Sequence, residues 1–205
     1  MLEAHDLACR RGNRRLFSAL SFSLQPGQLL RVAGANGSGK TSLLRLLAGL
    51  GLPTAGEVRW HSRPVQRQRD AYARALFYLG HLGGLKEDLS PLENLRADAG
   101  LTGSAVDDEG LNQALVQWGL ARQARLPVRV LSAGQRRRAA LARLALVDAP
   151  LWILDEPFNA LDSDAVAQLG RQIEQHIAAG GLAVITSHQP LPLPAERVTT
   201  LQLDS

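Results

Sequence analysis

The sequence predicts an α/β fold built around a parallel sheet and interrupted by a helical insert. Short apolar runs at residues 151–154 and 182–185 predict buried strands, and residues 163–179 between them have a helical pattern. A strand, a helix and a strand in that order predict a parallel pair joined by a crossover helix. The third observation is a glycine-rich loop that separates an apolar run at residues 29–33 from a leucine-rich helical segment.

The N-terminal third is predicted to begin with β structure. Within the first thirty residues, residues 19–24 alternate apolar and polar side chains, which predicts a half-exposed strand. Pro26 and Gly27 indicate a turn before the apolar run. Leucines 43, 44, 47 and 50 share one helical face, and residues 53–56 are expected to end that helix.

The rest of the chain is also predicted to contain both strands and helices. Ser90 and Pro91 suit the N-cap and the first position of a helix, and they open a helical region from about 90 to 147. The other expected elements are a strand at 75–79, helices at 111–120 and 135–147, and an edge strand at 197–203.

The composition is that of an ordinary globular chain, with 45% hydrophobic and 20% charged residues in 205. No apolar run is long enough to span a bilayer and the N-terminus lacks signal-peptide features, so a cytoplasmic protein is expected. The single cysteine, Cys9, cannot form an internal disulfide, which fits a reducing compartment. The net charge is +4, and the 21 arginines are interpreted as solvated surface rather than a nucleic-acid patch.

Residues 34–41 carry a phosphate-binding motif. The run Gly34-Ala35-Asn36-Gly37-Ser38-Gly39-Lys40-Thr41 matches G-x4-G-K-[ST] between a predicted strand and a predicted helix. Glycines let the backbone turn tightly and point its N–H groups inward, and the helix N-terminus adds a positive partial charge. Lys40 is expected to bind the β- and γ-phosphates, and the Thr41 hydroxyl is expected to bind Mg²⁺. Ser42 is predicted to belong to the same nucleotide site.

Two acids follow the strand at residues 151–154. The C-terminal ends of parallel strands face the ligand site, so Asp155 is predicted to hold Mg²⁺ through water. Glu156 is predicted to face the γ-phosphate and to polarise the attacking water. His188 follows the next strand and is expected to contact the γ-phosphate and to steady Glu156 or the water. ATP and Mg²⁺ are therefore the expected cofactors.

The run Leu131-Ser132-Ala133-Gly134-Gln135 resembles the LSGGQ signature of ATP-binding-cassette (ABC) ATPases, with Ala133 replacing one glycine. A Ser-x-Gly turn that opens a helix makes a second phosphate-binding cap. The resemblance implies that Ser132, Gly134 and Gln135 of one subunit cover the ATP held in the phosphate loop of another. Asp162, in Asn159-Ala160-Leu161-Asp162, resembles the D-loop that passes between subunits. The arginines at 136–138 are expected to be solvated helix surface.

Two positions depart from the ABC pattern. His81 stands where the family usually has a glutamine, and its ring can still approach Mg²⁺, through water, as expected for Asp155. Arg11 stands roughly where an aromatic residue stacks on adenine, and a guanidinium plane can also stack on a base. Phe17 and the three tryptophans are expected to be packing residues.

The resemblance covers essentially the whole chain and implies a P-loop NTPase fold of the ABC type. It implies one domain, 1–205, in which about 1–83 and 148–205 form a RecA-like core with an antiparallel β subdomain. Residues from about 84 to 147 would form a helical subdomain that carries the signature.

The stretch 9–17, His81, and the signature with its three arginines further resemble the ATP-binding subunits of cytochrome c maturation transporters, often called haem exporters. Those subunits work at the cytoplasmic face of the bacterial inner membrane with the membrane subunit CcmB, and with CcmC and CcmD. Their ATP use serves haem export or the release of the haem-loaded chaperone CcmE. The resemblance implies an ATP-sandwich dimer of two copies and no nucleic-acid partner.

Three alternatives remain open from the sequence. The same ATPase could serve another ABC transporter. A soluble ABC ATPase acting on nucleic acid or ribosomes usually has a long coiled-coil insert or two cassettes, and this chain has neither. A small P-loop kinase would consume ATP only with an added phosphoryl acceptor.

Overall fold

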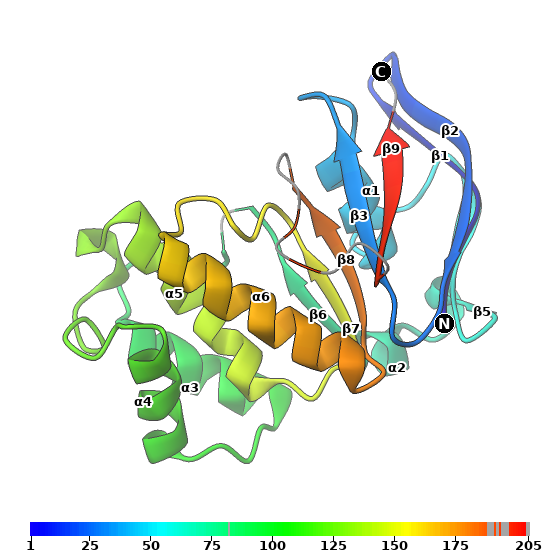
Figure 1. Cartoon of the computed structure of the whole chain (residues 1–205). Helices are drawn as coiled ribbons and strands as arrows, with labels where there is room; N and C mark the ends of the chain where they lie inside the picture. The colour runs from blue at the N-terminus through cyan, green and yellow to red at the C-terminus, as the bar shows by residue number, and fades with distance from the viewer. Residues whose placement is uncertain (82, 188–190, 192, 194–196, 204–205) are drawn as a thin grey trace. The chain divides into compact units, whose positions relative to one another are not determined.

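The computed structural model describes residues 1–81, 83–187, 191, 193 and 197–203 (Figure 1). The chain divides into two compact units. The first consists of Met1–Tyr78, Ala149–Glu156 and Gly170–Ser205, and the second of Leu79–Asp148 and Pro157–Leu169. Nearly all strand residues lie in the first unit, whereas the second consists mainly of helices and the loops between them.

The first unit contains a four-stranded antiparallel sheet in the order β2-β1-β4-β5. Its strands are β1 (Leu2–Arg11), β2 (Arg14–Leu24), β4 (Ala55–Trp60) and β5 (Arg63–Pro64). The β1–β2 hairpin turns through two residues, so that Arg11 pairs directly with Arg14. The expectation of β structure in the first thirty residues is confirmed, whereas β4 and β5 were not predicted.

The second sheet has five strands in the order β6-β7-β8-β3-β9. They are β3 (Leu29–Gly34), β6 (Leu76–Leu79), β7 (Leu151–Leu154), β8 (Leu182–Thr186) and β9 (Val198–Leu203). The pairs β7–β8, β8–β3 and β3–β9 are parallel. Helix α6 (Ser163–Ala178) connects β7 to β8, which confirms the predicted crossover, and β9 lies at the edge of the sheet as expected.

Helices α1 (Lys40–Leu47) and α2 (Arg69–Arg74) lie entirely in the first unit. Leu43, Leu44 and Leu47 of α1 are fully buried in the core, as the helical pattern predicted. The placement of Leu50 on that face is wrong: α1 ends at Leu47, Gly49 has a φ of 71°, and Leu50 is 54% exposed. The left-handed glycine ends the helix and takes Leu50 off its apolar face.

The second unit contains α3 (Pro91–Thr102), α4 (Asp108–Gln117) and α5 (Ala133–Ala142). The predicted start of α3 is confirmed, because Ser90 and Glu93 form a capping box and Pro91 is the first helical residue. Helix α5 ends five residues before the predicted residue 147, since the chain tightens into a 3-10 turn at Arg143–Leu146.

The expected packing residues lie inside. Phe17, Trp60, Trp118 and Trp152 are all less than a tenth exposed. Among the described residues, none of the helices combines the length and the apolar character needed to cross a membrane.

Candidate functional site

The phosphate loop connects β3 to α1 in the first unit, and two of its glycines are required by its geometry. A Cβ at Gly34 would lie 2.6 Å from the carbonyl oxygen of Leu203, so no side chain fits there. Gly39 occupies the N-cap of α1 with a φ of 102°. Because glycine has no capping side chain, the N–H groups of the first turn remain available to an anion at this helix N-terminus.

Lys40 is the first residue of α1 and is only 8% exposed. Its ammonium Nζ donates hydrogen bonds to the carbonyl oxygens of Gly34, at 2.8 Å, and Ala35, at 3.1 Å. These bonds hold the charge across the loop instead of letting it extend into solvent. Ala35, Asn36 and Gly37 are exposed, so the outer rim of the loop is open to a ligand.

Thr41 and Asp155 meet although they are 114 positions apart in the chain. The hydroxyl of Thr41 donates to Oδ2 of Asp155 at 2.8 Å, and Asp155 is 1% exposed. A hydroxyl oxygen beside a carboxylate is a hard-donor pair, which suits Mg²⁺ completed by phosphate oxygens and water. The residues therefore fit the ion that the sequence predicts, while Ser42 lies half-buried in the same turn of α1.

Glu156 follows Asp155 directly and is 8% exposed. Its backbone φ of 48° is left-handed, which a non-glycine residue rarely adopts. Its N–H donates to the hydroxyl of Thr186 at 2.7 Å, and that hydroxyl donates to Oδ1 of Asp155 at 2.7 Å. The two predicted acids are thus joined to β8 by a residue that the sequence interpretation did not select.

Tyr78, on β6, is a second neighbour that sequence reasoning missed. Its pKa is raised, first by burial and then by the negative charge of Asp155, while Arg45 acts in the opposite direction. An ordinary tyrosine is already protonated at neutral pH and this shift acts in the same direction, so the phenol is a hydrogen-bond donor. Its position one strand away from β7 could be recognised only once the strand order was known.

The β1–β2 hairpin tip lies beside the phosphate loop. A Cβ on Gly37 would lie 3.9 Å from Nη1 of Arg14. A Cβ on Gly39 would lie 3.0 Å from Cβ of Leu16. Arg11 pairs with Arg14 across the hairpin, and directly paired residues share a face of a sheet. Arg11 therefore projects from the same face of the hairpin as Arg14, and its predicted stacking on adenine stays a prediction.

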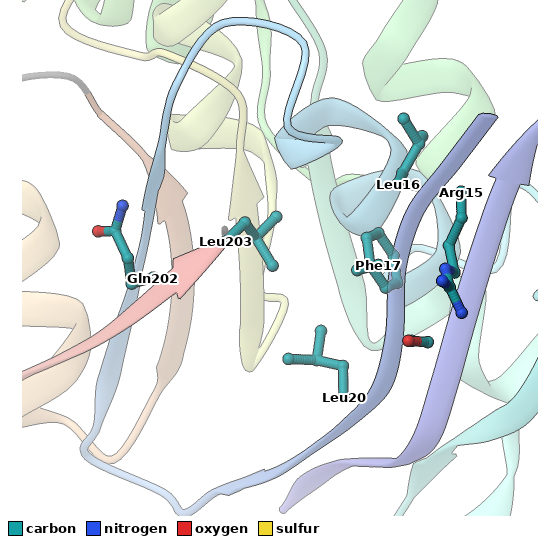
Figure 2. A pocket seen from close by; sticks show the side chains of 7 residues that line it. Arg15, Leu16, Phe17, Leu20, Gln202 and Leu203 are labelled. Atoms are coloured by element: carbon teal, nitrogen blue, oxygen red, sulfur yellow. The ribbon is translucent and has the colours of Figure 1, made fainter. Parts of the chain in front are cut away.

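A pocket of about 610 Å³ lies between β2 and β9 (Figure 2). Leu16, Phe17 and Leu20 line it from β2, and Gln202 and Leu203 line it from β9. Phe17 also adjoins the Cβ position of Gly39, and Leu203 adjoins that of Gly34. With Leu16, the pocket therefore shares three of its wall residues with the surroundings of the phosphate loop.

The signature turn opens α5 in the second unit. Ser132 is the N-cap, its hydroxyl accepts from the N–H of Gln135 at 3.2 Å, and the Gln135 side chain accepts from the N–H of Ser132 at 2.9 Å. Ser132 is exposed despite this capping box. A Cβ on Gly134 would lie 2.8 Å from the carbonyl oxygen of Ala160, so the glycine is required by close packing against the predicted D-loop.

Asp162, the last residue of that loop, stabilises α6. Its Oδ1 accepts from the N–H of Ala165 at 2.9 Å at the start of the helix, and its Oδ2 lies 3.8 Å from Nη1 of Arg138. Its side chain remains 60% exposed. The expectation that all three arginines at 136–138 are solvated is wrong for Arg137, which is buried and donates to the carbonyl oxygen of Pro157 at 3.1 Å.

The structure gathers the predicted site residues within each unit. Lys40, Thr41, Asp155 and Glu156 come together in the first, and Ser132, Gly134, Gln135 and Asp162 in the second. His81 is exposed after β6, and its predicted contact with Mg²⁺ or water stays a prediction. His188 lies outside the described residues.

Comparison with known proteins gives concordant matches. The sequence profile of the ABC transporter family matches residues 17–159. A protein of Aromatoleum aromaticum named "Cytochrome c biogenesis ATP-binding export protein CcmA" is 53% identical over 94% of this chain and 90% of its own length. A protein of the same name from Nitrosomonas europaea is 50% identical over 99% of this chain and 95% of its own length.

Solved structures match the fold at lower identity. A putative ABC transporter ATP-binding protein from Pyrococcus furiosus aligns with a TM-score of 0.82 and 24% identity, over 98% of this chain and 96% of that one. A dimeric post-hydrolysis state of the ATP-binding cassette MJ0796, bound to ADP and Pi, aligns with a TM-score of 0.80 and 21% identity. That alignment covers 92% of this chain and 88% of the other.

Proposed function

Because this chain belongs to the ABC transporter family, we propose that it hydrolyses ATP as the energy-coupling subunit of a transporter for c-type cytochrome biogenesis. The observation that supports hydrolysis best is the contact of Thr41 with Asp155 at 2.8 Å, next to the buried Glu156. The names of relatives about 50% identical over nearly the full chain support the assignment to cytochrome c biogenesis.

Each residue of the first unit has a proposed task. The loop N–H groups and Lys40 bind the β- and γ-phosphates, and Thr41 and Asp155 hold Mg²⁺. When bound, this ion supplies charge neutralisation at the phosphate oxygens. Glu156 accepts a proton from the attacking water, and its place at the C-terminal end of β7 suits that role. We retain His188 and His81 as proposed contacts to the γ-phosphate and to Mg²⁺ through water, respectively.

The adenosine part is proposed to lie against the hairpin tip. Arg11 and Arg14 share one face there, and Arg14 borders Gly37 of the phosphate loop. Among the described residues neither guanidinium takes part in an ion pair. Arg11 is thus available to stack on adenine, as its sequence position suggests.

Two copies are proposed to sandwich two ATP molecules, with Ser132, Gly134 and Gln135 of one facing the phosphate loop of the other. The exposure of Ser132 at a helix N-terminus supports this, because such a turn binds anions. Asp162 is proposed to lie at the interface between the copies. Loss of the γ-phosphate contact after hydrolysis would then let the pair open.

The membrane partner is proposed to be CcmB, with CcmC and CcmD, at the cytoplasmic face of the bacterial inner membrane. ATP use would drive haem export or the release of the haem-loaded chaperone CcmE. No nucleic-acid partner is proposed. The alternative is the same ATPase in another ABC transporter, and purification of the native membrane complex decides between them: recovery of a different membrane subunit would replace the CcmB assignment.

Mixing two inactive variants tests the sandwich. Lys40→Met removes the phosphate-binding charge, while Ser132→Asp keeps a good N-cap and places a carboxylate where the partner's phosphate would lie. If the sites are formed in trans, mixed dimers keep one intact site in two, and an equal mixture should recover about a quarter of the wild-type ATPase rate.

Ser132→Asn is the matched control, because it keeps both the cap and the neutral charge at this position. It should retain much more activity than Ser132→Asp. If the mixture stays as inactive as either variant alone while mixed dimers form, Lys40 and Ser132 serve the same chain and the sandwich proposal fails.

A further inference from the structure

The side chain of Thr186 occupies the junction between the two acids of the hydrolysis site. It ends β8, whose other residues Leu182, Ala183, Val184 and Ile185 are all apolar and buried. Thr186 is 0% exposed. Its hydroxyl donates to Oδ1 of Asp155 at 2.7 Å and accepts from the N–H of Glu156 at 2.7 Å.

These two bonds use the hydroxyl in its two distinct roles. A threonine hydroxyl has one proton to donate and lone pairs to accept with. The proton goes to the carboxylate and a lone pair receives the backbone N–H, so the direction of both bonds is fixed. A buried hydroxyl is costly unless it is paired in this way. Valine has nearly the same shape and would suit this buried strand, yet only a hydroxyl makes both bonds.

The first consequence concerns Asp155. Oδ1 receives the Thr186 hydroxyl while Oδ2 receives the Thr41 hydroxyl at 2.8 Å. With both oxygens engaged, the carboxylate plane cannot rotate without breaking a bond. Because the Thr41 hydroxyl donates its hydrogen to Asp155, the lone pairs of its oxygen remain available to Mg²⁺. Outer hydrogen-bond partners of this kind orient metal-binding groups and tune their affinity.

The second consequence concerns Glu156. Its φ of 48° is unfavourable for a residue with a side chain, and such conformations persist where surrounding contacts hold them. The N–H bonded to Thr186 belongs to this same residue. Loss of that bond would let the backbone relax toward a commoner conformation and would redirect the carboxylate that receives the proton.

We propose that Thr186 is a positioning residue for ATP hydrolysis, whose single hydroxyl sets the orientation of Asp155 and the backbone conformation of Glu156 together. This inference rests on the proposed ATPase function. It assigns no contact between Thr186 and the nucleotide. It therefore predicts effects on metal dependence and turnover that leave metal-free nucleotide binding unchanged.

The central variant is Thr186→Val, which removes the hydroxyl and keeps the volume. The fluorescent nucleotide MANT-ATP should bind to it in EDTA with an affinity within about twofold of wild type, because the phosphate loop is unaltered. The Mg²⁺ concentration that gives half-maximal activity should rise about 10-fold, and kcat should fall about 10- to 100-fold. The KM for ATP at saturating Mg²⁺ should change little.

Thr186→Ser restores the hydroxyl without the methyl group and should recover most of the Mg²⁺ response and of kcat. Ile185→Val is the packing control, since it removes one methyl group from the neighbouring fully buried position and leaves the Thr186 hydroxyl in place. Should the valine variant fail to fold, Thr186→Ala replaces it. The Ser and Ala variants both lack the methyl group and differ only in the hydroxyl.

Serine and alanine variants with equal kcat and equal Mg²⁺ response would overturn the proposal, as would a valine variant that behaves like wild type. A valine variant with weakened MANT-ATP binding in EDTA would also overturn it, because the residue would then support the phosphate loop. If the wild type binds nucleotide but does not hydrolyse it, the proposed function fails. The Mg²⁺ dependence of MANT-ATP binding still tests Thr186 in that case.

Discussion

The phosphate loop and the signature turn both open a helix with a glycine-containing turn, yet their polar groups are satisfied in different ways. At the start of α1 the N-cap is Gly39, which has no side chain to offer the helix. At the start of α5 the side chains of Ser132 and Gln135 form a capping box. The first helix N-terminus is therefore left for a ligand, whereas the second is stable alone and still presents an exposed serine.

Burial separates the two regions further. Lys40, Asp155 and Glu156 are each less than a tenth exposed, and hydrogen bonds within one unit fix them. Asp162 and Ser132 are exposed, and their bonds serve helix ends. The phosphate-loop region therefore holds buried charges in fixed positions, as catalysis requires. The signature region presents exposed polar groups, as binding to a partner requires. Substitutions in the first should change turnover, and substitutions in the second should change packing and assembly.

Glu156→Gln should have the largest effect. The amide cannot accept the proton of the attacking water, so ATP turnover should fall by about 10²- to 10⁴-fold. ATP binding should persist, and ATP-bound dimers should accumulate in size-exclusion chromatography. Glu87→Gln makes the same chemical change at an exposed residue outside the site and should leave the rate unaltered. Rapid turnover by Glu156→Gln would remove this residue from the catalytic role.

Gly134→Ala tests the second region. The new methyl group would lie 2.8 Å from the carbonyl oxygen of Ala160, closer than van der Waals contact permits. Overpacking of this kind costs about 1–3 kcal/mol, which should lower the urea midpoint of unfolding. Displacement of the loop at Ala160 should also weaken dimer formation with ATP.

Gly100→Ala is the matched control for that substitution. Gly100 lies in α3, and a Cβ there would meet nothing within 4 Å. Alanine in a helix interior should therefore stabilise by about 0.5–1 kcal/mol, the opposite sign. Equal responses of the two variants would show that the contact of Gly134 with Ala160 does not limit packing.

Much of the first region could be predicted from the sequence because its residues form contiguous motifs. The loop ending in Lys40 and Thr41 matches a motif of fixed spacing, and the two acids directly follow an apolar run recognisable as a strand. The structure brings Thr41 and Asp155 into contact. Thr186 and Tyr78 could not be predicted in this way. Their roles depend on strand order and register, which place residues distant in sequence beside Asp155.

One of the missed features, strand β4, did carry a local signal. Residues 57–60 alternate polar and apolar side chains, and Val58 and Trp60 are the buried ones in β4, as a half-exposed strand predicts. The burial of Arg137 carried no such signal, because residues 139–142 are all buried and give each of the three arginines buried neighbours at helical spacing. Its bond to the carbonyl oxygen of Pro157 depends on tertiary packing.

The smallest effect is expected at the end of β7 away from the acids. His176 stacks on Trp152 with ring centroids 4.0 Å apart, and its Nε2 lies 3.1 Å from the carbonyl oxygen of Leu182. Burial lowers its pKa below the ordinary 6.5, and the bonds to the carbonyls of Leu182 and Pro150 only partly oppose this. As the pH falls through 6.5 the unfolded chain takes up this proton before the folded protein does, so stability decreases.

Thermal unfolding at pH 7.5 and 5.5 measures that contribution. Carboxylates also titrate in this range, but their effect cancels when His176→Gln is compared with wild type. Tm should decrease between pH 7.5 and pH 5.5 in both proteins. For each kcal/mol that protonation of His176 contributes to the loss of stability, the decrease should be about 2–4 °C smaller in His176→Gln than in wild type. His61→Gln should alter this decrease in Tm less. The pKa of His61 is lowered too, but His61 is more exposed than His176. ATP turnover by His176→Gln at pH 7.5 should stay within about twofold of wild type, because His176 contacts Trp152 and Leu182 and not the two acids. A large loss of turnover would mean that packing at the start of β7 controls the geometry of Asp155 and Glu156, which follow its other end.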